Sequence, residues 1–406
     1  MKPLEGIRIL DFTRFMSGPM CTLLLSDFGA EVIKIERPPL GEDDRYGKII
    51  DTKASSHYAS RNRGKKSIVL DMKNDAHRAL FFELVKTADA VVENFRPGTM
   101  EKFGVTYERL EHINPRIVYT SITGYGQSGP LAGRAAFDAT VQAESGLMSI
   151  TGEVGRKPIK CGAAVGDYCG GLAGCIGTLM GIIDAQRTGH GRRVDVSMMD
   201  SLIFMLENQF SAFLRSGALP RPNGNRYIVG SPIGDFLCND GVPVMLNIAT
   251  DTQWRHLAQA MEQPQWLEDP DFASMALRTE HYQKVEAEVS RIFRQYSSEE
   301  VCRRLEAHRC AFGLVNDFEA VKNHPQVAHR EMIVRANYSN GVSFQVPGNP
   351  IWMSGMEREH DFKAAFLGED TFEILSEVAD ADTLHEIFDP VMEQVRQASE
   401  DMYRKS

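Results

Sequence analysis

Residues 7–35 read IRILDFTRFMSGPMCTLLLSDFGAEVIKI, and this stretch decides the fold. Short apolar runs over Ile7–Phe12 and Val32–Ile35 predict two buried strands, and the apolar spacing of Met20–Phe28 predicts a helix between them. Ser17-Gly-Pro19 interrupts the pattern before the helix. A strand, a helix and a strand in this order form a crossover unit, which joins parallel strands of one sheet.

The same alternation continues through the first half of the chain. Further strands are expected over 67–70, 90–92, 117–122 and 194–197, and helices over 75–87 and 107–112. This repeated order predicts an α/β fold with an open, doubly wound parallel sheet. The first turn between strand and helix has no GxGxxG motif, so a dinucleotide site gains little support.

A change of composition marks a boundary after the predicted sheet. Residues 217–225 are rich in Gly, Pro and Asn, which is typical of a linker. Beyond them, Asn239-Asp-Gly241 separates two apolar runs and predicts a hairpin. Helical patterns follow near 252–261, 282–296 and 299–308, so we expect a smaller α+β domain. A last helical stretch covers 383–403.

Composition excludes several classes of protein. The 406 residues carry a formal net charge of −10, whereas a general nucleic-acid binder needs a basic face, so we expect no nucleic-acid partner. Seven cysteines without a CxxC pair, and histidines without an HExxH spacing, predict a reduced compartment and no metal site. The N-terminal residues lack a signal-peptide pattern. We therefore expect a cytoplasmic protein.

Tyr168–Ile183 is the longest uncharged, largely apolar run. It is shorter than the roughly 20 residues that span a membrane, so we expect a buried helix and no membrane partner. Gly170, Gly174, Gly177 and Gly181 recur at helical spacing on one face. Because glycine is unfavourable inside helices, we expect another backbone to approach this face closely.

Asp167 opens this glycine-rich run and is the first candidate for chemistry. Helix N-termini favour negative charge, so an aspartate here is commonly a cap or a first-turn residue. The functional alternative is a carboxylate nucleophile or base, placed where glycines let a substrate come close. For Cys169 we favour a buried small hydrophobic residue over a reactive thiol, because no histidine is near in sequence.

Loops rich in cations and glycine flank several predicted strands. They are Arg61–Ser67 with Lys73 beyond it, Glu36–Pro38, Asn94–Gly98, and Gly124–Pro130 with Arg134 beyond it. The carboxyl ends of parallel strands bind ligands, so the cations of these loops are candidates to bind phosphates, and Phe95 to stack on a base. The alternative interpretation is a set of solvated loops and ordinary turns, and for Arg134 we favour it.

Seven segments, taken in order, closely resemble the family III CoA-transferases. They are Gly6–Phe12, Gly29–Pro38, Asn62–Ser67, Leu70–Lys73, Asn94–Gly98, Gly124–Pro130 and Gly166-Asp167. The resemblance covers nearly the whole chain. It implies an interlocked homodimer whose chains each have a Rossmann-like large domain and an inserted small domain. We expect the large domain over 1–216, the small one over 226–330, and a return to the large domain over 331–406.

The resemblance also implies an activity, in which CoA passes from an acyl-CoA to a free carboxylic acid with no tightly bound cofactor. Asp167 stands at the position of the family's catalytic aspartate, which forms a mixed anhydride and then an aspartyl-CoA thioester. A desolvated carboxylate held in line is an adequate nucleophile for this attack. Thioester and anhydride lie close in energy, so no ATP is needed.

Contacts to CoA carry over residue by residue. Arg37, Lys73, Arg96 and Lys102 match cationic positions near the phosphates; Leu70, Asn94 and Phe95 match the wall around adenine and pantetheine; and Met16 and Ser17 match the turn beside the thioester. We add Arg134 to these cofactor-binding candidates. Formyl-CoA transferase has Gln where Met16 stands and a tetraglycine loop where Gly230–Gly234 stands, so its formate and oxalate specificity does not carry over.

Two other functions are weighed against this one. The α-methylacyl-CoA racemases resemble the chain in fold and in Asp167, but they use a histidine where Phe137 stands, and phenylalanine moves no proton. A non-catalytic CoA-binding protein would keep the cations without needing Asp167. Arg14 is either a partner for the second carboxylate of a dicarboxylic acid or a surface arginine, and both interpretations stay open.

Overall fold

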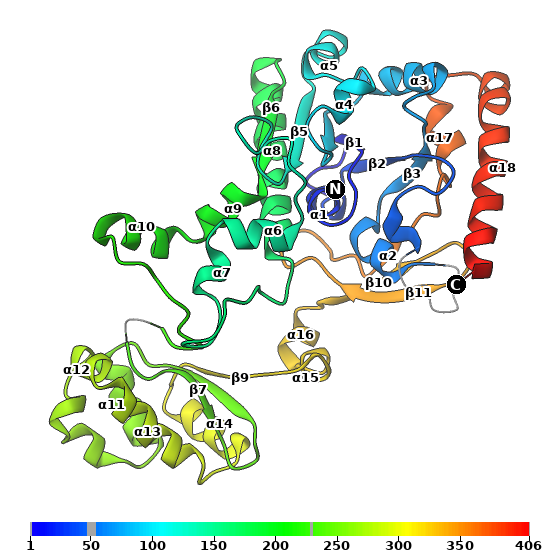
Figure 1. The fold of residues 1–406 in the computed structure, drawn as a ribbon. Coiled ribbons are helices and arrows are strands. Elements are labelled where there is room, and N and C mark those ends of the chain that lie inside the picture. Colours follow the sequence, from blue (N-terminus) through cyan, green and yellow to red (C-terminus); the bar gives the residue numbers. More distant parts are fainter. Residues whose placement is uncertain (1, 47–53, 228–229, 406) are drawn as a thin grey trace. The chain divides into compact units, whose positions relative to one another are not determined.

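The computed structural model describes residues 2–46, 54–227 and 230–405, and these divide into two units (Figure 1). The larger unit comprises 1–147, 160–217 and 325–406, and the smaller unit comprises 148–159 and 218–324. The division expected from the sequence differs at 148–159, which joins the smaller unit, and at 325–330, which belongs to the larger unit. A backbone hydrogen bond from the Gly224 N–H to the Gly152 carbonyl at 2.9 Å connects segment 148–159 to the rest of the smaller unit. The segment closes on itself through a bond from the Ile159 N–H to the Thr151 carbonyl at 3.1 Å.

A six-stranded parallel sheet is the centre of the larger unit, as predicted. Its order is β3-β2-β1-β4-β5-β6, and all five pairings are parallel. The bounds are β1 Arg8–Asp11, β2 Glu31–Glu36, β3 Lys66–Val69, β4 Ala90–Glu93, β5 Val118–Thr123 and β6 Arg193–Ser197. The strand order reverses between β1 and β4, and a crevice forms at such a point in parallel sheets.

Helices cover both faces of this sheet (Figure 1). One face carries α3 (Asp75–Val85), α5 (Tyr107–Ile113), α17 (Thr371–Leu375) and α18 (Ala381–Lys405). The other carries α1 (Ser17–Asp27), α8 (Val165–Thr188) and α9 (Met198–Met205). Strand residues alternate between the two cores: Leu10 and Ile33 face the first, whereas Ile9 and Val32 face the second. A sheet buried on both sides explains the unbroken apolar runs in the sequence.

The glycine face of α8 packs closely, as expected, although its partners are mostly side chains. An added Cβ at Gly174 would stand 2.4 Å from Ile122 of β5, and one at Gly181 would stand 2.7 Å from Val118. Only at Gly171 is the neighbour a backbone atom, the Ser17 carbonyl oxygen of α1 at 2.6 Å. The prediction of a buried helix holds for this face of α8 only, because the opposite face, including Leu172, Ile176 and Met180, is exposed in the single chain.

Among the described residues, α8 is the one helix long and apolar enough to cross a membrane. In that apolar window 44% of the residues are buried. An interior helix of a globular protein meets the same criterion, so this is weak support for a membrane span.

Ser17-Gly18-Pro19 was expected to precede a helix that starts at Met20, but it forms the first turn of α1. Proline is tolerated there because the first N–H groups of a helix have no partner inside the helix. Gly18 permits the close approach of the preceding loop, since an added Cβ would stand 2.4 Å from Thr13. The helix therefore begins directly after the loop that follows β1.

The remaining elements of the larger unit complete the scaffold. They are α2 Ser56–Asn62, α4 Thr99–Lys102, α6 Asp138–Glu144, α10 Glu207–Ser216, α16 Pro325–His329, β10 Ile333–Asn337, β11 Ser343–Pro347 and β12 Asp361–Lys363, with α7 Leu147–Ile150 at the boundary. The sheet β11-β10-β12 packs its apolar side against Tyr58 and Ala59 of α2. Segments far apart in sequence thus fix the orientation of α2.

The smaller unit has a sheet of order β7-β8-β9 over its own apolar core. Strands β7 (Ile233–Leu237) and β8 (Pro243–Asn247) form the predicted hairpin, and β9 (Phe312–Leu314) pairs with β8. Its helices are α11 Asp251–Ala260, α12 Met275–Glu280, α13 Tyr282–Phe293, α14 Ser298–Ala307 and α15 Phe318–Lys322. Trp254 stacks on Trp266 in this core, with ring centroids 5.2 Å apart.

Candidate active site

Loops at the carboxyl ends of the parallel strands surround a cavity of about 680 Å³ in the larger unit. Its walls include the loop after β1 with Met16 and Ser17, the loop after β4 with Asn94 and Arg96, and the start of α8 with Asp167. The first two loops lie on either side of the point where the strand order reverses. Ligands bind at this position in open parallel sheets.

Asp167 lies in the first turn of α8 and lines the cavity. Burial of its carboxyl and, after it, the negative charge of Asp138 raise the pKa of this group to about 6. The positive charge of Arg61 and hydrogen bonds from the side chain and backbone of Ser17 act in the opposite direction. The group is therefore largely ionised at neutral pH and only partly hydrated, which suits a carboxylate nucleophile.

Asp138 is the second acidic group at this end of α8. Its Oδ1 accepts a hydrogen bond from the Gly166 N–H at 2.8 Å, and its Oδ2 accepts one from Gln142 Nε2 at 2.7 Å. The carboxylate thus satisfies an N–H group at the start of α8 that has no partner inside the helix. Asp138 holds the backbone beside Asp167 and places a negative charge close to it.

The loop after β1 is held tightly around the cavity. Asn94 Oδ1 accepts a hydrogen bond from the Arg14 N–H at 2.8 Å. Asn94 Nδ2 donates to the Arg14 carbonyl at 2.8 Å and to Ser17 Oγ at 3.3 Å. Phe15 adopts a left-handed backbone with φ of 62°, which is strained for a bulky residue. Glu42 offsets this strain by accepting the Phe15 N–H at 2.8 Å. The loop therefore holds Ser17 in one position beside Asp167.

Helix α2 supplies a further wall. His57 and Arg61 both line the cavity, and Arg61 forms an ion pair with Asp44. Sequence reasoning missed His57 as a site residue and placed Arg61 in a phosphate-binding loop. The one signal available was the spacing of four residues, which puts both side chains on the same face of a helix.

A second cavity of about 490 Å³ lies beside the first at the same sheet edge. It is lined by Arg37, Leu70 and Lys73, which follow β2 and β3. Arg14 and Phe95 border both cavities. One elongated ligand can therefore lie with its anionic end against the cations of the second cavity and reach Asp167 in the first.

The structure groups most of the residues expected to bind CoA. Those lining the first cavity with Asp167 are Met16, Ser17, Asn94, Phe95, Arg96 and Arg134, and those lining the second are Arg37, Leu70, Lys73 and Phe95. Lys102, at the end of α4, is exposed and lines neither cavity. The Arg134 guanidinium also forms an ion pair with Glu144 at 2.6 Å.

The structure contradicts the interpretation of 61–67 as a phosphate-binding loop. Arg63 pairs with Asp27 at 2.9 Å and Lys65 pairs with Asp11 at 3.0 Å, and all four side chains are buried. Lys66 pairs with Glu31 on the adjacent strand at 2.8 Å. These cations neutralise acidic groups within the fold, because a buried charge needs a partner.

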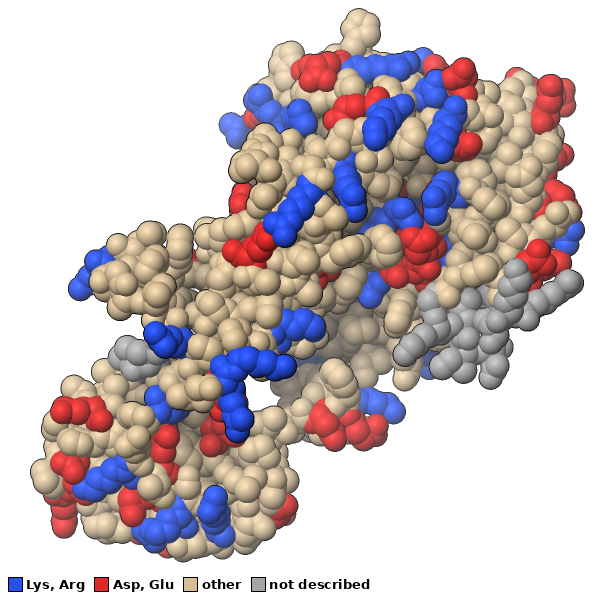
Figure 2. Space-filling view, viewed as in Figure 1, with Lys and Arg blue, Asp and Glu red and all other residues tan. Residues whose placement is uncertain are grey.

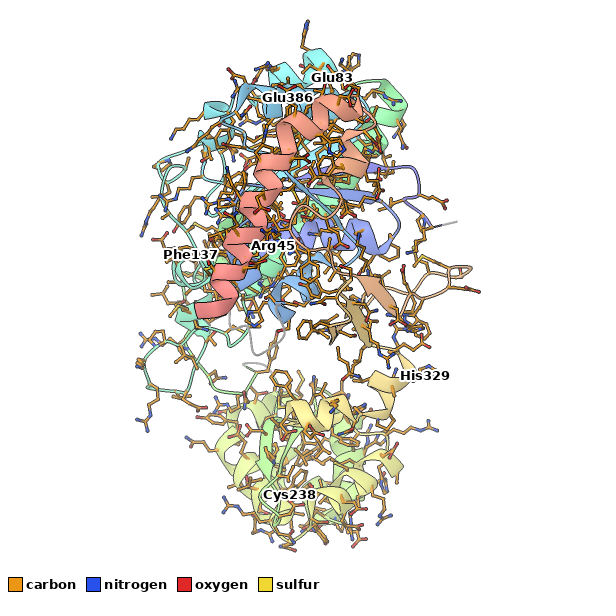
Figure 3. All side chains as sticks on the ribbon, turned by 90° about the vertical axis from the view of Figure 1, so that its right-hand side faces the viewer. Arg45, Glu83, Phe137, Cys238, His329 and Glu386 are labelled. Atoms are coloured by element: carbon orange, nitrogen blue, oxygen red, sulfur yellow. The ribbon has the colours of Figure 1, made fainter. Side chains whose placement is uncertain are left out.

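Charged side chains of both signs are interspersed on the face of the molecule that Figure 2 shows. Figure 3 shows Arg45 in the interior of the larger unit, where it pairs with Glu36 at 2.5 Å, and Phe137 toward the edge. Glu36 lines the second cavity, as expected of its loop, and its buried ion pair with Arg45 lowers its pKa to about 2. Phe137 is 65% exposed and meets the Phe15 ring edge-on, with centroids 6.4 Å apart.

Two other chemistries gain no support from the geometry. Burial and Asp138 raise the pKa of the Cys169 thiol, the reverse of what a reactive thiolate needs. Within residues 2–46, 54–227 and 230–405, no group of three or more His, Cys, Asp or Glu side chains is placed to hold a metal ion.

Comparison with known proteins agrees with this arrangement. Residues 4–371 match the family model described as CoA-transferase family III. The chain is 34% identical to an acetyl-CoA:oxalate CoA-transferase from Acetobacter aceti, with 88% of this chain and 91% of that protein covered. It is 33% identical to a succinate–glutarate CoA-transferase from Agrobacterium fabrum, covering 93% and 96%. A crystal structure of a CAIB/BAIF family protein from Brucella suis superposes with a TM-score of 0.83 at 31% identity, covering 93% and 100%.

Proposed function

The chain belongs to CoA-transferase family III, and from this premise we propose that Asp167 carries the acyl group and then CoA between an acyl-CoA and a free carboxylic acid. The observation that supports this most directly is the position of Asp167. Its partly buried carboxyl lines a cavity that shares two wall residues, Arg14 and Phe95, with a second cavity whose wall includes Arg37 and Lys73. A bound acyl-CoA can therefore present its thioester to this carboxylate.

The reaction consists of four acyl transfers. A carboxylate oxygen of Asp167 attacks the thioester carbonyl carbon, the C–S bond breaks, and CoA leaves as a thiolate. The thiolate attacks the Asp167 carbonyl of the resulting anhydride, which releases the first acid as a carboxylate and leaves an aspartyl-CoA thioester. The incoming carboxylate attacks that thioester and expels the thiolate. Attack of the thiolate on the new acyl carbonyl gives the product acyl-CoA and restores Asp167.

The surroundings of Asp167 suit these steps. Partial burial removes water from the attacking oxygen, and hydrogen bonds from Ser17 hold the carboxylate in one orientation. Asn94 and Glu42 fix the loop that carries Ser17. These residues act by positioning, and the bond changes take place at Asp167.

We propose that CoA lies with its phosphates near Arg37 and Lys73 and its adenine against Leu70 and Phe95. All four line the second cavity, at the carboxyl ends of β2, β3 and β4. Cations and an aromatic ring are the groups that recognise phosphates and a base. The strand order, with a crevice beside β1 and β4, supports a Rossmann-like description of the larger unit.

The relatives suggest the class of acid. Their names specify oxalate, succinate and glutarate, which are all dicarboxylates. We therefore propose that at least one acid used by this enzyme is a short dicarboxylate. The racemase alternative is disfavoured because Phe137, in the cavity wall, carries no proton to exchange.

Substitution of Asp167 tests the proposal. Asp167→Asn keeps the shape and removes the nucleophilic charge, so CoA exchange should fall at least a thousandfold while CoA binding persists. With wild type and acyl-CoA alone, hydroxylamine should convert the activated carboxyl to a hydroxamate on the peptide that holds Asp167. Cys169→Ser is the matched control and should leave both results unchanged. Exchange is measured by mass spectrometry of the acyl-CoA product. Near-normal exchange by Asp167→Asn would reject this mechanism.

A further inference from the structure

Helix α2 turns one face toward the cavity that holds Asp167. His57 and Arg61 are four residues apart and both line this cavity. Tyr58 and Asn62, which are also four residues apart, are buried on another face. The packing of Tyr58 against β10 and β11 fixes the rotation of the helix. The two basic side chains therefore belong to a rigid wall of the site.

Some N–H donors of the Arg61 guanidinium have no partner among the residues that the structure describes. The side chain of Arg61 is 18% exposed. Its Nη1 forms both the ion pair with Asp44 and a long hydrogen bond of 3.4 Å to the Phe15 carbonyl. Its Nε and Nη2 have no partner among the described residues. A guanidinium presents five N–H groups in a planar fork. Asp44 thus pairs with one end of the guanidinium, and the remaining N–H groups are available to a further carboxylate.

The other arginines of this cavity are placed differently. Arg134 is half exposed and pairs with Glu144, Arg14 pairs with Asp43 and also borders the second cavity, and Arg96 is exposed on the loop after β4. Arg61 is absent from the second cavity and is the cation whose charge acts on the Asp167 carboxylate. It is therefore close enough to serve a ligand whose other end reacts at Asp167.

We propose that Arg61 binds the distal carboxylate of a short dicarboxylic acid while the proximal carboxylate reacts at Asp167. This inference rests on the proposed function. A fork of charged donors gains two hydrogen bonds from a second carboxylate and none from the methyl end of a monocarboxylic acid of equal length. A site built for such bonds rejects the analogue that lacks the polar group, because its own donors stay unpaired.

The test compares two acids that differ in the distal group. Succinate and butanoate are offered as acceptors with acetyl-CoA as donor at pH 8, well above the pKa of Asp167. We expect wild type to have a kcat/KM for succinate at least tenfold above that for butanoate. Arg61→Met should remove this preference by lowering kcat/KM for succinate and not that for butanoate. Arg61→Lys should restore part of the preference. A general effect on Asp167 would lower kcat/KM for both acids equally. A change in the succinate-to-butanoate ratio therefore reports on the distal carboxylate.

Arg14→Met is the matched control, because Arg14 lines the same cavity. It should weaken acyl-CoA binding and leave the succinate-to-butanoate ratio within about threefold of wild type. Glutarate and pentanoate form a second pair one methylene longer. Calorimetric binding of succinate and butanoate to wild type and Arg61→Met, without CoA, gives a readout that does not depend on turnover.

The outcomes separate the two proposals. If no acid accepts CoA from any donor, the proposed function fails, and the calorimetric difference between the acids still decides the role of Arg61. If transfer occurs but wild type shows no preference for the diacids, or Arg61→Met lowers both acids equally, Arg61 does not bind the distal carboxylate. If Arg14→Met removes the preference, Arg14 is the residue that binds it.

Discussion

At the scale of single residues, the environment of Asp167 determines when it can react. Asp138 from α6, Arg61 from α2 and Ser17 from α1 face its carboxyl, and together with burial they set its pKa at about 6. The ionised form attacks and the protonated form does not. Activity is therefore expected to fall as the pH drops through the pKa, with a plateau on the alkaline side.

This environment predicts a shifted pH profile. The wild-type kcat/KM for acyl-CoA should have an inflection near pH 6 and be flat above about pH 7.5. Asp138→Asn keeps an acceptor for the Gly166 N–H but removes the repelling charge, so the inflection should move to lower pH. Glu144→Gln, which alters an acidic group paired with Arg134, should leave it in place. Steady-state rates across pH 4.5–9 check this, and an unmoved inflection in Asp138→Asn would show that repulsion by Asp138 is negligible.

At the scale of secondary-structure elements, the contact between helices α1 and α8 determines the position of Ser17. The Ser17 carbonyl lies against Gly171, where a Cβ would stand 2.6 Å away, and Ser17 donates hydrogen bonds to Asp167. Helix packing and the alignment of the nucleophile are therefore coupled through a single glycine.

Gly171→Ala should lower both stability and activity. The added methyl group forces α1 away from α8, and overpacking of this kind costs about 1–3 kcal/mol of unfolding free energy. Displacement of Ser17 should also reduce kcat more than it changes the KM for acyl-CoA. Thermal unfolding and steady-state kinetics measure the two effects. Gly313→Ala is the control, because a Cβ there meets nothing within 4 Å; equal behaviour of the two variants would contradict the coupling.

At the scale of the whole molecule, the outer face of α8 needs an explanation. Leu172, Ile176 and Met180 follow one another at intervals of four residues and are 47%, 52% and 65% exposed. A continuous apolar stripe on one helix marks an interaction surface. We propose that a second copy of the chain covers it, in keeping with the interlocked homodimer that the resemblance to the family implies.

The dimer is testable by sedimentation. Wild type should sediment as a dimer at nanomolar concentration, because apolar area of this kind gives stable subunit contacts. Ile176→Asp places a charge in the stripe and should yield monomer or aggregate with little activity. Gln265→Asp, at an exposed polar position, should remain dimeric and active. A folded and active wild-type monomer would rule out the proposal.

The sequence by itself determined the parallel sheet, the crossover helices and the position of Asp167 at a glycine-bounded helix start. These features are visible because the period of apolar residues and the placement of glycine are local properties of the chain. The order of seven short segments further indicated the family, and Met16, Ser17, Asn94 and Phe95 do line the cavity of Asp167.

Only the tertiary structure decided which charges are available to a ligand. Arg61, Arg63 and Lys65 stand within five residues of one another, yet Arg63 and Lys65 neutralise buried Asp27 and Asp11, and Arg61 alone lines the cavity. The partners lie 36 and 54 residues away in sequence. A local pattern does not encode which distant acidic group a cation will meet, since that depends on how strands and helices pack. Burial of both charges then makes the pairing obligatory.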